Sequence, residues 1–354
     1  MTHTTRFSLA LLSLSLCGSV NAVESDKLQQ RLVPLPYEAP TWQDNPSSPE
    51  KIELGKQLFF DPRLSIDGTV SCNSCHDVQG NGTDSRATSV GVKGQTGDRS
   101  APTVWNSVFL TALMWDGRME TLKDQAKGPI LNPIEMAMPH EQAAVERIAS
   151  IPGYVDQFTK IFGGENTVTY DNIAKAIAVY EATLITPNSR FDQYLLGNKS
   201  VLSREEENGM NTFIELGCAR CHFGPAMAGP KLPQGVPFFQ WFPAFASSYN
   251  DEYKLVEDLG KAEEGEQASD GVRRGKWRVP TLRNIATTAP YFHNGSVKTL
   301  NKAVRVMARA QLNRELTDYE ADVLEAFLKT LTGEFPKQDK PQLPGDAEKF
   351  ATTD

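Results

Sequence analysis

Apolar residues recur at helical spacing along several stretches of the chain, and the strict alternation typical of strands is rare. The segment 170–186 has isoleucine, alanine, valine and leucine at positions that share one helix face. The segment 297–312 brings Leu300, Met307 and Leu312 onto a broadly common face. Proline and glycine are abundant between such stretches. The pattern predicts a mainly α-helical fold whose helices are joined by long loops.

Two capping boxes mark the starts of further helices. In Ser203-Arg-Glu-Glu206 and in Thr317-Asp-Tyr-Glu320, a hydroxyl residue precedes a glutamate by three positions. In such a pair each side chain satisfies the backbone amide of the other residue at the first helical turn. We therefore expect one helix after the first box, and a final helix that runs from the second box to near Gly333.

The candidate chemistry lies in two short strings, Cys72-Asn-Ser-Cys75-His76 and Cys218-Ala-Arg-Cys221-His222. In the pattern C-x-x-C-H, two thiols can add across the vinyl groups of one haem while the histidine binds its iron. A thioredoxin-like pair or half of a zinc site is the alternative for a single string. Two copies, with one further cysteine near the N-terminus, favour two covalently bound haem c groups. We call them the first and second haem strings.

Each haem string belongs to one copy of an internal repeat. The segments 53–59 and 207–213, upstream of the strings, share glutamate, glycine and phenylalanine at the same relative positions. Downstream, 102–122 and 280–300 share residues at a constant offset of 178. The strings themselves are 146 residues apart, so the second copy carries 32 extra residues, which we assign to a surface excursion at about 229–271.

The repeat predicts two fused cytochrome c-like domains, each wrapping one haem. We place the N-terminal domain at 23–185 and the C-terminal domain at 186–335, followed by a tail at 336–354. The length suffices for two separate cores. The formal charge is −8, which disfavours nucleic acid as a partner and is compatible with a basic or dipolar electron carrier.

Residues 1–22 have the features of a secretory signal peptide. Arg6 precedes an apolar run, and Ala22 stands before an acidic stretch. Cys17 lies inside this segment, so the four remaining cysteines all belong to the haem strings. No later segment approaches the roughly 20 apolar residues that a membrane span requires. Export together with covalent haem predicts a periplasmic location.

The sixth iron ligand separates electron transfer from catalysis. Met307 lies on an amphipathic helix of the second copy and is the expected ligand of the second haem. Met227 is only five residues beyond His222, too near to reach the opposite haem face, and Met210 belongs to the helix before the second string. The alternative for Met307 is a methionine that fills the core.

The first copy has no methionine at the matching place. At the 178-residue offset Met307 corresponds to Pro129, which cannot bind iron. Gln125 and Glu135 lie near it, and a carboxylate above the iron can move the proton that peroxide cleavage requires. Two alternatives stay open: Met136 or Met138 as ligand, and Glu135 as an ordinary surface carboxylate.

With these residues in view, the chain resembles the bacterial dihaem cytochrome c peroxidases from about Pro49 to Pro336. Besides the haem strings, the matching stretches are 54–64, Ala101-Pro-Thr-Val104, Trp115-Asp-Gly-Arg118, Gln125-Ala-Lys-Gly-Pro129, Asn132-Pro-Ile-Glu-Met136, Val279-Pro-Thr-Leu-Arg-Asn284, Pro290-Tyr-Phe-His293, Met307 and Gln311-Leu312.

The resemblance implies a peroxidase that reduces hydrogen peroxide with electrons from a small periplasmic donor, either a cytochrome c or a cupredoxin. The first haem would be the low-potential peroxide site, with Gln125 and Glu135 as distal groups. The second haem, with Met307, would be the high-potential site of electron entry. Trp115 would carry electrons between the haems. The resemblance also implies a homodimer, and a Ca²⁺ ion bound by the backbone carbonyls of Thr288 and Pro290.

Two positions depart from the family pattern. Many members have a histidine that blocks the peroxide site until the second haem is reduced, where this chain has Val92. His140 is the unassigned histidine nearest in sequence, and it lies beyond Glu135, so we predict that the inhibitory ligand is absent. Ser100 replaces an asparagine whose side chain binds calcium in the family, and a hydroxyl is a weaker oxygen ligand.

Two other functions are compatible with the fold. Related dihaem enzymes oxidise tryptophan residues of a partner protein, and the loss of the blocking histidine at Val92 resembles them. In those enzymes the second haem often has a tyrosine ligand, so Met307 favours the peroxidase. The third possibility is a dihaem electron carrier without catalysis, which Glu135 and Gln125 beside an unligated haem face argue against.

Overall fold

The computed structural model describes residues 22–229, 237–262 and 271–345. The predicted signal segment up to residue 21, parts of the predicted excursion, and the last nine residues of the tail lie outside these ranges. Within them the chain is mainly helical, as predicted, and no helix there is long and apolar enough to cross a membrane. The two strands, β1 (Phe239–Phe242) and β2 (Gly275–Arg278), pair antiparallel with Phe239 opposite Arg278.

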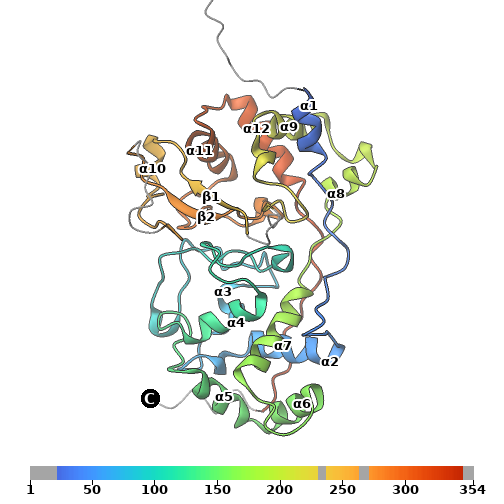
Figure 1. Ribbon diagram of the computed structural model, residues 1–354, viewed down its shortest axis with the longest axis vertical. Coiled ribbons are helices and arrows are strands. Elements are labelled where there is room, and N and C mark those ends of the chain that lie inside the picture. The colour runs from blue at the N-terminus through green and yellow to red at the C-terminus, as the bar shows by residue number, and fades with distance from the viewer. Residues whose placement is uncertain (1–21, 230–236, 263–270, 346–354) are drawn as a thin grey trace, which may run out of the picture.

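The molecule consists of two stacked helical units (Figure 1). The helices of the first unit are α2 (Pro49–Phe60), α3 (Cys72–Cys75), α4 (Leu122–Leu131), α5 (Glu141–Ala149), α6 (Pro152–Phe162) and α7 (Tyr170–Ala182). Those of the second are α8 (Arg190–Leu195), α9 (Arg204–Glu215), α10 (Ser248–Glu252), α11 (Leu300–Leu312) and α12 (Asp318–Lys329). Short 3₁₀ helices are η1 (Pro62–Leu64), η2 (Val92–Gly94), η3 (Ser107–Phe109), η4 (Lys199–Val201), η5 (Cys218–Arg220) and η6 (Ile285–Thr287).

The glycines of the upstream repeat are the crossing points of matching helix pairs. α2 packs on α7, and α9 packs on α12. A Cβ atom on Gly55 would lie 2.0 Å from the carbonyl oxygen of Ala176, and one on Gly209 would lie 1.9 Å from that of Val323. No side chain fits at either place, which explains why the repeat has glycine in both copies.

The helices that carry the predicted distal groups also match. Thr121 caps α4 by accepting the N–H of Asp124, and Thr299 caps α11 by accepting that of Lys302. The two threonines are 178 residues apart, the offset of the downstream repeat. α4 packs on α7 as α11 packs on α12. The structure thus keeps α4 and α11 in the register in which Pro129 corresponds to Met307.

Two asparagines join the units. Asn106 and Asn284 both have left-handed backbone conformations, at φ values of 65° and 61°. Their Nδ2 atoms donate to the same acceptor, Oγ1 of Thr186, over 2.7 and 2.8 Å. Their Oδ1 atoms accept the backbone N–H groups of Thr186 and Gly333. The two asparagines therefore make nearly equivalent hydrogen bonds at the junction, and both donate to the single hydroxyl of Thr186.

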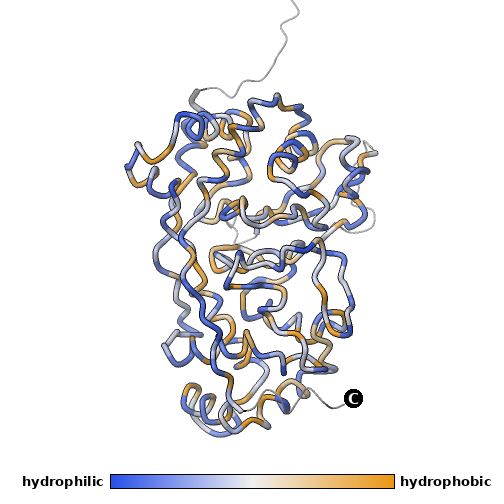
Figure 2. The backbone as a smooth tube through the Cα atoms, turned by 180° about the vertical axis from the view of Figure 1, so that it is seen from behind, coloured by the Kyte–Doolittle hydropathy of each residue, from blue (hydrophilic) through white to orange (hydrophobic). Residues whose placement is uncertain are grey.

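The two ends of the described chain cross over between the units. Helix α1 (Ala22–Gln29) lies beside α9 at the far end from α2 (Figure 1), and Leu28 and Leu32 are buried in the core of the second unit. At the other end, Phe335 packs edge-on against Trp105 of the first unit, over 5.2 Å between ring centroids. The connecting segments run side by side along one edge of the molecule (Figure 2).

Because the two ends cross over, the observed units differ from the predicted domains in two segments. Residues 23–35 were expected in the N-terminal domain, yet this segment lies on the second unit, because Leu28 and Leu32 find their apolar partners there. Residues 336–345, expected as a tail, lie on the first unit, where Gln338 accepts a hydrogen bond from the Tyr180 hydroxyl. The boundary near residue 185 falls beside Thr186 at the junction.

Candidate active site

Both haem strings fold into one tight helical turn. The N–H groups of His76 and His222 donate to the carbonyls of Cys72 and Cys218, over 2.9 and 3.0 Å. The four thiols are free, and burial raises the pKa of each. Zinc ligands and redox-active thiols need a lowered pKa. Within the described ranges, no cluster of three or more histidine, cysteine or acidic residues could hold a metal ion. The strings thus fit thioether attachment of haem.

The histidine of each string is held for iron binding in the same way. Nδ1 of His76 lies 3.0 Å from the carbonyl oxygen of Pro102, and Nδ1 of His222 lies 3.2 Å from that of Met227. Donation from Nδ1 leaves the lone pair of Nε2 for a metal. Burial lowers the pKa of both imidazoles, that of His222 to about 4, so both are neutral. The contact also places Met227 beside His222, away from the opposite haem face.

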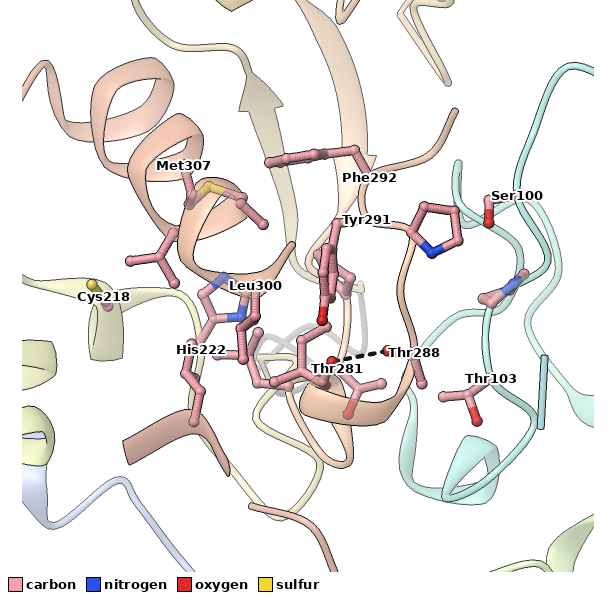
Figure 3. A pocket seen from close by; sticks show the side chains of 18 of the residues that line it. Ser100, Thr103, Cys218, His222, Thr281, Thr288, Tyr291, Phe292, Leu300 and Met307 are labelled. Carbon is pink, nitrogen blue, oxygen red and sulfur yellow. Dashed lines mark hydrogen bonds between the residues drawn. The ribbon is translucent and has the colours of Figure 1, made fainter. Parts of the chain in front are cut away.

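An apolar space surrounds the second string. Cys218, His222 and Met307 line two adjoining cavities, and Trp115 of the first unit reaches into both. Figure 3 shows Met307 on α11 and His222 facing the same space, with Ser100 of the first unit at its far side. Further apolar lining residues are Phe213, Leu216, Leu282, Val304, Leu324 and Leu328. Sulfur and imidazole ligands within apolar walls fit a haem between His222 and Met307.

Trp115 links the surroundings of the two strings. Its Nε1 atom donates to the carbonyl oxygen of Ser100 over 2.8 Å. Two residues further along the chain, the carbonyl of Pro102 accepts the hydrogen bond from His76. The histidine of the first string is therefore connected to the tryptophan beside the second string through two hydrogen bonds and a short stretch of backbone.

Glu135 lies close to the first string. Burial is the main cause of the raised pKa of Cys72 and Cys75, and the negative charge of Glu135 adds to it in both. The carboxylate accepts a hydrogen bond from Nδ2 of Asn132 over 2.7 Å. Burial raises the pKa of Glu135 above its usual value, and the nearby guanidinium of Arg118 and the Asn132 amide oppose this rise. A half-buried carboxyl of this kind can take up and release a proton.

Gln125 lies on the same helix as Pro129, half-buried, one turn after the cap of α4. The structure shows no side-chain hydrogen bond that ties it to the first string, so its distal role remains a prediction. Sequence reasoning overlooked Met114 and Met119, whose methyl groups each lie 3.6 Å from a Cβ built on Gly128. Neither falls on the helical pattern that identified Met307, because both lie in a loop.

Comparisons with known proteins agree on one family. A family model described as di-haem cytochrome c peroxidase matches residues 49–200. The cytochrome c551 peroxidase of Nitrosomonas europaea is 46% identical over 302 residues, which cover 84% of this chain and 85% of that protein. The chain belongs to the di-haem cytochrome c peroxidase family. The cytochrome c551 peroxidase of Pseudomonas aeruginosa is 39% identical over 346 residues, 96% of each chain.

The fold comparison agrees with the sequence comparison. A crystal structure of a MauG-like protein associated with microbial copper homeostasis has a TM-score of 0.67 and 30% sequence identity, covering 85% of this chain and 95% of that one. A second family model, described as RoxA-like, cytochrome c-like, matches residues 277–313. The predicted fold class, the predicted peroxidase function and the two haem c groups are thereby confirmed at the level of the family.

The position of the family's blocking histidine lies against Glu135. The backbone N–H of Val92 donates to the carbonyl oxygen of Glu135 over 2.9 Å, and the Val92 side chain is buried, with 1% of its surface exposed. His140 is exposed and caps α5 by accepting the N–H of Ala143 at Nδ1. Met138 is buried in the core of the first unit.

The three residues at which the resemblance implies a calcium site come together at the junction of the units. Ser100, Thr288 and Pro290 all line the larger cavity. The Ser100 N–H donates to the carbonyl of His293 over 2.7 Å, and its hydroxyl donates to the carbonyl of Arg86 over 3.3 Å. The Ser100 hydroxyl thus already has a protein partner.

Proposed function

We propose that this member of the family reduces hydrogen peroxide to water at a haem on the first string. Electrons would enter from a small donor protein at a haem on the second string, bound by His222 and Met307. The relatives named as cytochrome c551 peroxidases support a monohaem cytochrome c as the donor, and a cupredoxin is a second possibility. The signal-like segment at 1–22 supports a periplasmic location.

The difference between α4 and α11 carries this proposal. The two helices have matching caps and matching packing. α11 presents Met307 to the cavity of the second string, and α4 has Pro129 at the same register. The first unit instead has the half-buried Glu135 carboxyl, whose charge adds to the raised pKa of Cys72 and Cys75. One unit is therefore suited to holding an electron, and the other to binding and protonating a small substrate.

The haem of the first unit would supply the iron that binds peroxide and the electrons that cleave its O–O bond. Glu135 would take a proton from one oxygen of the peroxide and deliver it to the other. Asn132 holds the carboxylate in place through its hydrogen bond. Gln125 would donate a hydrogen bond to the bound peroxide. Each turnover consumes two electrons and two protons and yields two water molecules.

The second unit would serve as the electron entry. A thioether ligand such as Met307 stabilises reduced iron and raises the potential. Trp115 borders the cavity of the second string and is connected through Ser100 and Pro102 to His76. Electrons would pass to the first haem along this connection.

Calcium and dimerisation complete the proposal. The Thr288 and Pro290 carbonyls near Ser100 would bind a Ca²⁺ ion at the junction of the units, where it would stabilise their relative position. The resemblance to the family supports a homodimer. Removal of calcium by a chelator, followed by calorimetry and sedimentation, tests both parts.

Steady-state turnover tests the reaction. Holoprotein mixed with hydrogen peroxide and a reduced monohaem cytochrome c should oxidise two cytochromes per peroxide. Absence of turnover, with both haems present, would contradict the peroxidase assignment.

A second reaction is favoured by one observation, the valine at position 92. Methylamine utilization protein MauG of Methylorubrum extorquens is 31% identical over 94% of this chain, and the oxidation of tryptophan residues in a partner protein would also use an unblocked haem. Under that assignment, turnover with reduced cytochrome would be absent, and a partner protein would be oxidised instead. Met307 supports the peroxidase.

A further inference from the structure

One buried carboxyl of the first unit has no role in the mechanism above. Glu181 lies near the end of α7 and has only 4% of its surface exposed. Its Oε2 atom is buried without a hydrogen-bond partner. Leaving such an atom without a partner is costly, so a buried glutamate of this kind calls for a functional explanation.

The internal repeat shows which way Glu181 faces. The carbonyl of Ala176 lies against Gly55, and that of Val323 lies against Gly209. Ala176 and Val323 are therefore equivalent in the two units, and they are 147 residues apart in the sequence. The same spacing relates Glu181 to Leu328 on α12. Leu328 lines the cavity shared by His222 and Met307. Glu181 therefore occupies, in the first unit, the place from which the second unit presents an apolar side chain to its haem.

Local electrostatics agree with this placement. Burial is the largest cause of the raised pKa of the Cys72 thiol, to which the first haem would be attached, and of Tyr180, and the charge of Glu181 adds to both. Burial alone raises the pKa of Glu181, to about 8. The charged side chains of the elements packed against α7 do not contribute to this rise. They are Glu50, Lys51, Glu53 and Lys56 on α2, Lys123, Asp124 and Lys127 on α4, and Glu141, Glu146 and Arg147 on α5.

We propose that Glu181 is the redox-linked proton acceptor of the first haem. When the haem accepts one electron, the Glu181 carboxylate takes up one proton from solvent. When the haem gives the electron up again, the carboxylic acid releases that proton. The inference rests on the assignment of the first haem to the first string in the proposed function.

The physical reason is charge balance in a low-dielectric site. A carboxylate stabilises the oxidised haem, which carries one more positive charge, and a neutral acid does not. Reduction removes that positive charge and makes the buried carboxylate unfavourable, so a proton follows the electron. Peroxide reduction needs two protons for two electrons, and Glu181 would store one of them near the site of their use.

The test is a redox titration of the holoprotein at several pH values, read from the absorption spectrum of each haem. In the wild type, the potential of the first haem should fall by up to about 59 mV per pH unit around neutral pH, the value for one proton per electron. Glu181→Gln and Glu181→Leu should both remove this slope and leave the second haem unchanged. Leucine is the residue that the second unit has at this place. Glu141→Gln is the control, because Glu141 is an exposed glutamate on α5, which also packs on α7, and this variant should leave the slope of the first haem intact.

A slope that persists in both Glu181 variants, or a first haem whose wild-type potential does not change with pH, would overturn the proposal. Haem content and the spectrum of the second haem show whether each variant is folded. The titration needs no turnover, so a protein that lacks peroxidase activity would refute the proposed function without affecting this test.

Discussion

The two units have the same arrangement of helices around their haem strings, but they differ in the side chains that would act on each haem. Gly55 and Gly209 allow the same close helix crossing, and Asn106 and Asn284 share one hydroxyl at the junction. Two residues that line the cavity of the second string have different counterparts in the first unit. Met307 corresponds to Pro129 at the 178-residue offset, and Leu328 corresponds to Glu181 at the 147-residue offset.

This difference shows where duplication preserved residues and where it did not. The repeated residues are those that the backbone requires, because no Cβ fits at the crossings and each helix needs a cap. The divergent residues are those to which we assign the ligand and the charge of each haem. Each prediction below changes one residue of a proposed haem site or of the junction and states what its loss should do to that unit.

The largest expected effect follows from removing the acid of the first unit. Glu135→Gln should leave both haems bound and lower peroxide turnover by about 10²–10⁴-fold, the usual loss when acid–base catalysis is removed. In the wild type, the second-order rate with peroxide should fall as the pH drops through the raised pKa of Glu135, because only the ionised carboxyl can accept the proton. Stopped-flow absorbance measures both effects.

Glu141→Gln is the matched control, since Glu141 is exposed at the start of α5. It should leave the rate unchanged. If Glu135→Gln also turned over peroxide at the wild-type rate, Glu135 would have no part in the mechanism.

The second prediction concerns the ligand of the electron-entry haem. Met307→His should keep the second haem six-coordinate and lower its potential, because imidazole stabilises reduced iron less than a thioether does. Axial ligands control potentials over a range of about 0.8 V, so the drop should be large enough to slow reduction by the donor. The near-infrared sulfur–iron band should disappear. Its persistence would mean that a methionine other than Met307 binds the iron.

The third prediction concerns the spin state of the first haem in the oxidised protein, which we expect to depend on Val92. Valine has no lone pair for iron, and His140 is occupied as a helix cap. The fully oxidised protein should therefore show a high-spin signal from one haem in electron paramagnetic resonance and should react with peroxide directly. Val92→His should convert that signal to low-spin and make the reaction dependent on prior reduction. Two low-spin haems in the wild type would show that another group blocks the site.

Much of this architecture follows from the sequence, because its signals are local or repeated. Capping boxes predicted the starts of α9 and α12, and the 178-residue offset predicted that Met307 corresponds to Pro129. Helical periodicity predicted the helix that carries Met307, and the structure places Met307 and His222 on one cavity. These predictions needed only periodicity and spacing.

The features that the sequence did not predict depend on contacts between residues that are far apart in the chain. Helix α1 has eight residues, and its partners lie on α9, far along the chain. Glu181 lies in the apolar part of the stretch 170–186, and helical periodicity alone does not indicate that its carboxyl is buried. Its match with Leu328 needs the offset of 147 residues, which becomes visible only once the packing of α7 and α12 is known.

The smallest expected effect concerns calcium. Ser100→Asn would restore the side-chain carbonyl of the family at the junction, beside the Thr288 and Pro290 carbonyls. A carbonyl oxygen is a better Ca²⁺ ligand than a hydroxyl that already donates to Arg86. We expect affinity to rise by about tenfold or less, since tenfold corresponds to about 1.4 kcal/mol, the scale of one added polar contact. Calorimetric titration of calcium-free holoprotein measures this change, with Ser100→Ala as the control that should not bind more tightly. Equal affinities for wild type and Ser100→Asn would show that the side chain at position 100 does not reach the ion.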